Sequence, residues 1–136
     1  MIEITCHCLL QGSKFSPTLT ERLHGIKLEG KNEIGDIGKI GKYKNKPIPY
    51  GSGVFVISNN LLDPSYDHYK KIDLLEKLIP KLKSYGVEFM DVLITVAYYN
   101  QCNFELSSLL LRRLAALKIP ISFSCYEKDS STLSEN

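Results

Sequence analysis

The sequence lacks several features that would assign a function class directly. It contains no tryptophan and only three histidines, and no apolar run approaches the roughly 18 residues that a membrane-spanning helix needs. The start, "MIEITCHCLLQG", has an acid at position 3 and only a short apolar stretch, which is unlike a secretory signal peptide. We therefore expect a cytoplasmic protein that does not cross a membrane.

Net charge is also nearly absent. The formal charge of +2 is too small to make the whole domain a nucleic-acid binder. Its distribution is uneven, because residues 31–53 alone carry +3. The composition, 43% hydrophobic and 24% charged over 136 residues, is typical of one soluble globular domain.

The four cysteines are the first candidates for chemistry, because Cys6 and Cys8 flank His7. Without an export signal they are expected to be free thiols rather than disulfides. Residues 2–10 alternate apolar and polar side chains, which predicts a strand. On a strand Cys6 and Cys8 share one face and His7 takes the other, so the three cannot converge on one ion. A site made of Cys6, Cys8 and Cys125 is conceivable, since Cys125 shares a face of the last strand with Ile121 and Phe123, but zinc ligands usually come as spaced pairs on turns. We expect core thiols and no metal.

Periodicity and capping residues predict the remaining elements. Ser16, Pro17 and Gly25 are suited to the cap, first and C′ positions of a short helix. A helix over about 67–85 contains Pro80, which should kink it or begin a fresh turn. Ser107 or Ser108 caps the next helix. The predicted order is a strand over 2–10, a helix over 17–24, a long loop over 28–53 with a strand at 53–58, the helix over 67–85, a strand over 87–100, a helix within 106–119 and a strand over 120–127.

This order predicts one α+β domain over residues 1–127, followed by a flexible polar tail at 128–136. We expect a roughly four-stranded, mainly antiparallel sheet with three helices packed on one face. Strand order is not predicted, and a fifth short strand is possible within 28–53.

The loop over 28–53 is the most unusual stretch. It holds six glycines and five lysines, and loops this long are usually functional or mobile. Gly35, Gly38 and Gly41 lack the strand and helix context of a nucleotide-binding fingerprint. The flanking side chains suit contact with phosphates or with an acidic protein surface, while a solvated connector is the alternative; they are Lys39, Lys42, Tyr43, Lys44 and Lys46.

A tyrosine pair and the scattered histidines complete the candidates. Tyr98 and Tyr99 end a strand, and tyrosines are enriched in protein interfaces, although one of them in the core and the other on the surface is equally compatible with the pattern. His7, His24 and His68 stand in no recognisable arrangement with a nucleophile and an orienting acid. We expect no enzyme and no cofactor.

Several segments resemble a family of small bacterial proteins, domain of unknown function 4279. They are "FSPTLTERLHGI", "IGDIGKIGK", "GVFVIS" and above all "FELSSLLLRRLAALKIPISFSCYE". Gly35-Asp36 matches the loop of that family, whereas Phe55 stands where a tryptophan is often found. The resemblance implies an α+β fold and a bacterial source, and it carries over no functional residues. Small single-domain proteins of this kind often serve as immunity partners of secreted toxins.

The leading hypothesis is a non-enzymatic protein-binding module, most specifically an immunity protein that neutralises a toxin of the contact-dependent inhibition type. Its partner would be a cognate toxin domain, whose active site the loop over 30–53 and nearby tyrosines would cover. The alternative is a small RNA- or nucleotide-associated protein that uses the lysines of 39–46. An enzyme with an unrecognised site is a third possibility.

Overall fold

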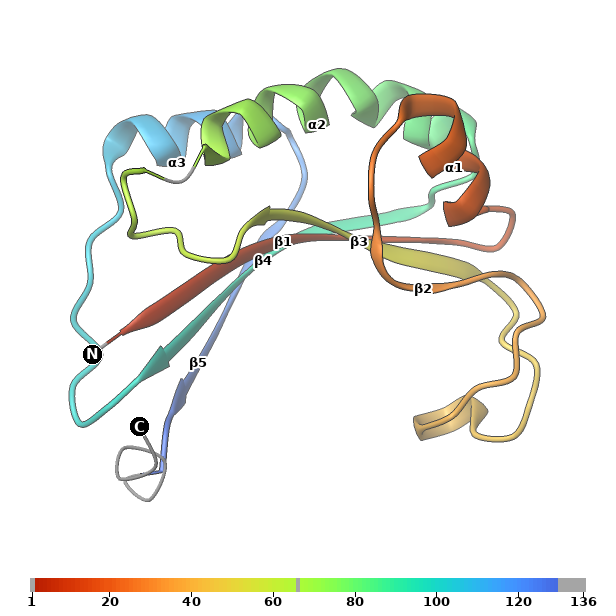
Figure 1. Ribbon diagram of the computed structural model, residues 1–136, viewed down its shortest axis with the longest axis horizontal. Helices are drawn as coiled ribbons and strands as arrows, with labels where there is room; N and C mark the ends of the chain where they lie inside the picture. The colour runs from red at the N-terminus through yellow and green to blue at the C-terminus, as the bar shows by residue number, and fades with distance from the viewer. Residues whose placement is uncertain (1, 66, 130–136) are drawn as a thin grey trace.

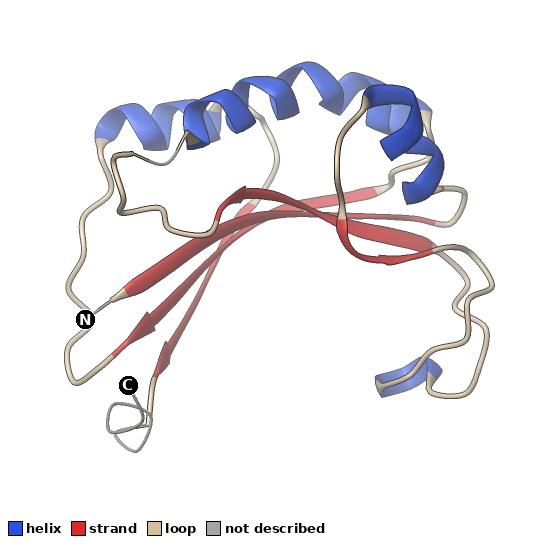
Figure 2. Cartoon of the chain, viewed as in Figure 1, coloured by secondary structure: helices blue, strands red, loops and turns tan. Residues whose placement is uncertain are grey.

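The computed structural model describes residues 2–65 and 67–129. One five-stranded sheet forms a layer, and three helices lie together on one of its sides (Figures 1 and 2). The predicted α+β class is confirmed. The elements in chain order are β1 (Glu3–Gly12), α1 (Pro17–His24), β2 (Glu29–Asn32), the short 3₁₀ helix η1 (Gly41–Tyr43), β3 (Gly51–Ser58), α2 (His68–Ser84), β4 (Phe89–Tyr98), α3 (Ser108–Ala115) and β5 (Ile121–Glu127).

The strands lie in the order β2-β3-β1-β4-β5. The β2–β3, β3–β1 and β1–β4 pairs are antiparallel, whereas β4 and β5 are parallel. The sheet is therefore mixed, with five strands instead of the four expected, and β2 is the fifth strand that was left open within 28–53. The parallel pair exists because α3 carries the chain back along the helix-covered face before β5 begins.

The core lies between the sheet and the helices. Along β1 every second side chain is buried, from Ile4 through Cys6 and Cys8 to Leu10. This confirms the predicted strand and the core position of both thiols. From α2 come Ile72, Leu75, Leu78, Ile79 and Leu82, spaced so that they fall on one side of a helix.

Helix ends follow the predicted capping residues. The Ser16 hydroxyl accepts a hydrogen bond from the Leu19 N–H (3.2 Å), and Gly25 ends α1 in the left-handed region at φ 63°. The Ser107 hydroxyl caps α3 by accepting from the Leu110 N–H (3.1 Å). Pro80 lies inside α2, which continues on both sides of it, so the predicted fresh turn does not occur. No helix among the described residues combines the length and the apolar character needed to cross a bilayer.

The last strand differs from its prediction. Cys125 does share a face of β5 with Phe123, but both side chains are exposed rather than packed in the core. The reason is position: β5 is the edge strand, and no other strand of residues 2–65 and 67–129 pairs with its outer side. Of the predicted tail at 128–136, only Lys128 and Asp129 lie within the described residues. The Lys128 ammonium pairs with the Glu3 carboxylate at 2.6 Å.

Candidate functional site

The stretch between β2 and β3 forms an arm, residues 33–50, that projects beyond the end of the sheet (Figure 1). Backbone hydrogen bonds connect the two sides of the arm. The Gly35 N–H donates to the Ile48 carbonyl (2.7 Å), and the Gly38 N–H donates to the Lys46 carbonyl (2.9 Å). The η1 turn, Gly41–Tyr43, closes its tip. The arm is thus a built extension of the hairpin rather than an irregular connector.

The regularly spaced glycines serve this backbone geometry. Gly35 and Gly41 adopt φ values of 91° and 71°, which side chains disfavour. At Gly38 a Cβ atom would lie 2.2 Å from the Tyr43 carbonyl oxygen, so only glycine permits that crossing. The three glycines are accounted for by the backbone conformation of the arm. Their spacing therefore gives no indication of a phosphate-binding loop.

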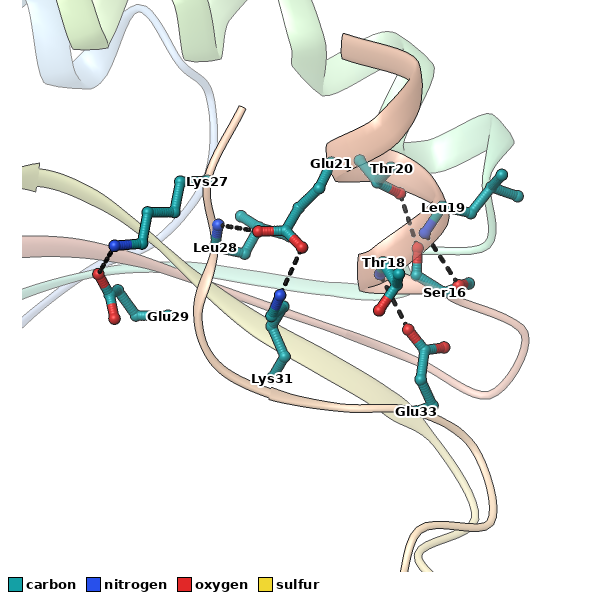
Figure 3. A network of polar contacts seen from close by, with 10 residues as sticks. All are labelled: Ser16, Thr18, Leu19, Thr20, Glu21, Lys27, Leu28, Glu29, Lys31 and Glu33. Atoms are coloured by element: carbon teal, nitrogen blue, oxygen red, sulfur yellow. Dashed lines mark hydrogen bonds and ion pairs between the residues drawn. The ribbon is translucent and has the colours of Figure 1, made fainter. Parts of the chain in front are cut away.

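Two glutamates connect α1 to the first residue of the arm and to the segment that leads into it (Figure 3). The Glu33 carboxylate accepts from the Thr18 N–H at 2.9 Å. Glu21, on α1, accepts from the Leu28 N–H (2.7 Å) and from the Lys31 ammonium (2.5 Å). These bonds lower the pKa of Glu21 below its ordinary value, because they favour the charged carboxylate. The arm therefore leaves the body of the protein at a fixed place.

The tip of the arm, residues 37–46, exposes both basic and apolar side chains. It carries four exposed lysines and no acid, and none of the four is in an ion pair with another described residue; they are Lys39, Lys42, Lys44 and Lys46. Among them Ile40 is 86% exposed. Tyr43 stacks edge-on with Tyr50 (6.0 Å between ring centroids) and lies 5.5 Å from the Lys42 ammonium.

Tyr98 and Tyr99 do not join this surface. They lie at the far end of β4, where the Lys128 N–H donates to the Tyr98 carbonyl (2.7 Å) and the Lys128 ammonium lies 5.4 Å from the Tyr99 ring. The arm leaves the other end of the sheet, next to Gly51. A ten-residue strand such as β1 separates the two ends by about 30 Å. The expectation that the tyrosines lie near the arm is wrong.

A cavity that sequence reasoning missed lies between the start of α2 and α3. It has a volume of about 300 Å³ and is lined by Leu61, Leu62, Pro64, His68, Tyr69, Glu105, Leu106, Ser107 and Leu110. His68 is only 6% exposed and its Nδ1 has no hydrogen-bond partner among the described residues. Burial lowers the pKa of His68, against the opposing effect of Asp67. The only sequence signal was its place at the start of the buried face of α2.

The cavity is not arranged as a hydrolytic site. The Ser107 hydroxyl caps α3 and lies 3.5 Å from the Tyr69 hydroxyl, so its contacts are with those groups and not with His68. His68 itself stacks against Tyr69, with 4.7 Å between ring centroids. What the arrangement provides is a small hollow with the buried imidazole of His68 in its wall.

The four cysteines are free thiols that lie in two separate places, two in the core and two near the edge of the sheet. Burial raises the pKa of Cys6 and of Cys8 to about 12, so both thiols stay protonated and act as small core groups. Cys102 and Cys125 are neighbours at the outer edge, and the burial of Cys102, followed by its proximity to Cys125, raises the pKa of Cys102. Within residues 2–65 and 67–129, no three or more histidine, cysteine or acidic side chains are grouped to hold a metal ion.

No family model, curated protein or solved structure matches the chain. The resemblance to domain of unknown function 4279 thus stays a prediction. The interpretation of the arm rests on its geometry, exposure and charge.

Proposed function

We propose that the protein is a non-enzymatic binding module whose arm docks on a partner protein. In its most specific form, it is a cytoplasmic immunity protein that covers the active site of a cognate bacterial toxin domain. The observation that supports this best is Ile40, 86% exposed at the tip of the arm and flanked in the sequence by lysines that form no ion pair with another described residue.

An isoleucine that is 86% exposed buries little apolar surface within its own chain, so it contributes little hydrophobic stabilisation to the fold. If a partner buries it fully, the transfer from water contributes about 1.5–3 kcal/mol to binding. The backbone ladder and the anchors at Glu21 and Glu33 hold the arm before a partner arrives. A preorganised arm loses less conformational entropy on binding than a mobile loop does.

The chemistry of the tip specifies the partner surface. Four lysines without an acid among residues 37–46 favour a partner that is acidic around the contact, because such charges steer association. Ile40 at their centre favours an apolar depression within that acidic rim. An acidic cleft at a toxin's active site has both properties, so occlusion requires no chemistry from the arm.

Nucleic acid is the competing ligand for a lysine-rich tip. Sequence-tolerant binding of single strands relies on aromatic rings that are free to stack with bases. Tyr43 is already engaged by Tyr50 and lies beneath Lys42, and an exposed isoleucine adds nothing to phosphate contact. Both points favour a protein surface.

The test compares two variants with the same change of net charge. The arm variant replaces Lys39, Lys42 and Lys44 by glutamine, and the control variant replaces the exposed Lys77, Lys81 and Lys83 of α2 by glutamine. A partner is first captured from the lysate of the source cells, and its affinity for each variant is then measured at low and high salt. We expect weaker binding and a smaller salt dependence for the arm variant only.

Ile40→Asp provides a second measurement, because losing the burial of Ile40 should weaken binding roughly 10- to 100-fold. The immunity role predicts that the captured partner inhibits growth when it is expressed alone. Coexpression of the present chain should then restore growth. Equal affinities of the arm and control variants would refute the docking surface. A captured partner that is harmless when expressed alone would refute the immunity role while leaving the docking surface intact.

A further inference from the structure

The two edges of the sheet are built differently. β2, at one edge, has only four residues, of which Glu29 and Lys31 are charged, and its pairing with β3 is irregular. Short, charged and irregular edges resist pairing with other chains. β5, at the opposite edge, has seven residues, and Glu127 is its only charged residue. It lacks the protection that β2 has.

The outward backbone groups of β5 follow from its pairing with β4. At one end the Val92 N–H donates to the Pro120 carbonyl (2.9 Å), and at the other the Lys128 N–H donates to the Tyr98 carbonyl (2.7 Å). Since successive residues of a strand alternate in direction, the even-numbered residues between these points bond to β4. The backbone groups that point away from the sheet are those of Ile121, Phe123, Cys125 and Glu127.

Apolar side chains accompany this edge. Phe123 is 52% exposed and Tyr126 is 50% exposed, on opposite faces of β5. On α3, Arg113 pairs with Asp73 of α2, and a residue two positions away points roughly 200° around the helix. The exposed Leu111 therefore points away from α2, toward the side on which β5 lies.

We propose that β5 is a dimer interface, where a second copy of this chain adds its own β5 antiparallel and the two sheets become one. One register uses every outward backbone group, with the two-fold axis passing between the two Ser124 residues. Ile121 then lies opposite Glu127 of the second copy, and Phe123 lies opposite its Cys125. Two bonds in each of the four pairs give about eight hydrogen bonds.

Charge and side-chain placement favour a second copy as the occupant. The two Glu127 carboxylates lie at opposite ends of the paired strands, so no like charges face each other. A two-fold axis perpendicular to the sheet keeps the helices of both copies on the same side, with each Leu111 directed toward the other subunit. The Phe123–Cys125 pairs bring sulfur against an aromatic ring, which is a favourable contact. This inference is independent of the arm and of the function proposed for it.

Sedimentation equilibrium of the whole chain tests the dimer. Over about 10–500 μM, a range that reaches weak interfaces, the mass should rise from 15.4 kDa toward twice that value. Cys125→Pro should remain monomeric, because proline removes an outward N–H and leaves the ladder with β4 intact. Phe123→Lys should also be monomeric. It replaces Cys125→Pro as the test variant if the proline variant does not fold. Glu29→Lys, on the β2 edge, should dimerise like the wild type.

Cross-linking tests the register. In a background where Cys102 and Cys125 are replaced by serine, Ser124→Cys should form a disulfide-linked dimer under mild oxidation, because the Cα atoms of that pair are expected about 4.5 Å apart. Tyr126→Cys, on the same face but with its two copies more than about 10 Å apart, should not. A wild-type chain that stays monomeric throughout would overturn the proposal. So would a dimer that survives both edge variants, or equal cross-linking of both cysteine variants.

Discussion

Replacing Cys8 by serine should destabilise the fold measurably, although the change exchanges one sulfur atom for oxygen. Cys8 is fully buried on the middle strand of the sheet, opposite Phe55 of β3 and Val92 of β4. Both of those neighbours are apolar, so a serine hydroxyl at this position is removed from water without a ready partner. Burying an unsatisfied hydroxyl costs about 1–3 kcal/mol. That is a large fraction of the roughly 5–15 kcal/mol that stabilises a typical domain.

The assay is urea unfolding, followed by the far-ultraviolet circular dichroism of the sheet and helices. For a slope of about 2 kcal/mol per molar urea, a loss of 1–3 kcal/mol moves the midpoint down by about 0.5–1.5 M with the slope unchanged. Cys125→Ser is the matched control, measured at a protein concentration too low for the β5 dimer, because the Cys125 side chain is exposed in the single chain. It should change the free energy of unfolding by less than about 0.5 kcal/mol.

Equal stability of the Cys8→Ser and Cys125→Ser variants would refute the reasoning, because it would mean that Cys8 does not occupy an apolar, water-free position. Thiol labelling provides an independent check. Cys125 should react with an aromatic disulfide reagent in the native protein. Cys6 and Cys8 should react only after unfolding, because burial raises the pKa of each to about 12 and the thiolate is the reactive form.

Two further predictions concern stability. Burial lowers the pKa of His68, so below about pH 6.5 the unfolded chain binds more protons than the folded one and the free energy of unfolding falls with decreasing pH. His68→Gln should flatten this slope between pH 7 and 5 in urea titrations, and an unchanged slope would assign it to other groups. Gly12→Ala should cost about 1–3 kcal/mol, because the new Cβ would lie 1.9 Å from the Gly86 carbonyl oxygen. Gly53→Ala, whose Cβ would meet only the Leu28 side chain and Pro17 at 3.3 Å and beyond, should cost less when the two variants are compared by urea unfolding.

Local chemistry explains which elements could be predicted from the sequence. The alternation from Ile4 to Leu10 marks a strand with one buried face, and Ser16 and Ser107 mark helix starts, because these patterns depend on neighbouring residues alone. The same reasoning separated His7 from Cys6 and Cys8. All of these features are present in the structure.

Features that depend on distant partners could not be predicted in this way. β2, with the sequence EGKN, has no strand propensity of its own and exists because β3 lies beside it. Cys125 has the same local pattern as Cys8, yet it is exposed because β5 is the last strand of the sheet, a property of strand order. His68 resembles any polar residue at a helix start until the packing of α3 encloses it.

The residues predicted for partner binding are separated in the structure. The lysines of 39–46 are all exposed on the arm, while Tyr98 and Tyr99 lie at the other end of the sheet. Their separation follows from the direction of β4, which runs away from the arm. Glycine spacing indicated an unusual backbone, but the ladder between Gly38 and Lys46 depends on residues that pair across the arm and leave no periodic pattern.

The ion pair between Glu3 and Lys128 has a practical consequence for experiments on this protein. It links β1 to the residue that follows β5, across the intervening β4, at the end of the sheet opposite the arm. A reporter group, an affinity handle or a sensor surface joined at either of these positions would thus be held about 30 Å from the arm. Immobilising the chain there presents Ile40 and its lysines to the solution in one orientation. This end of the sheet is therefore a suitable place for attaching the protein to a surface.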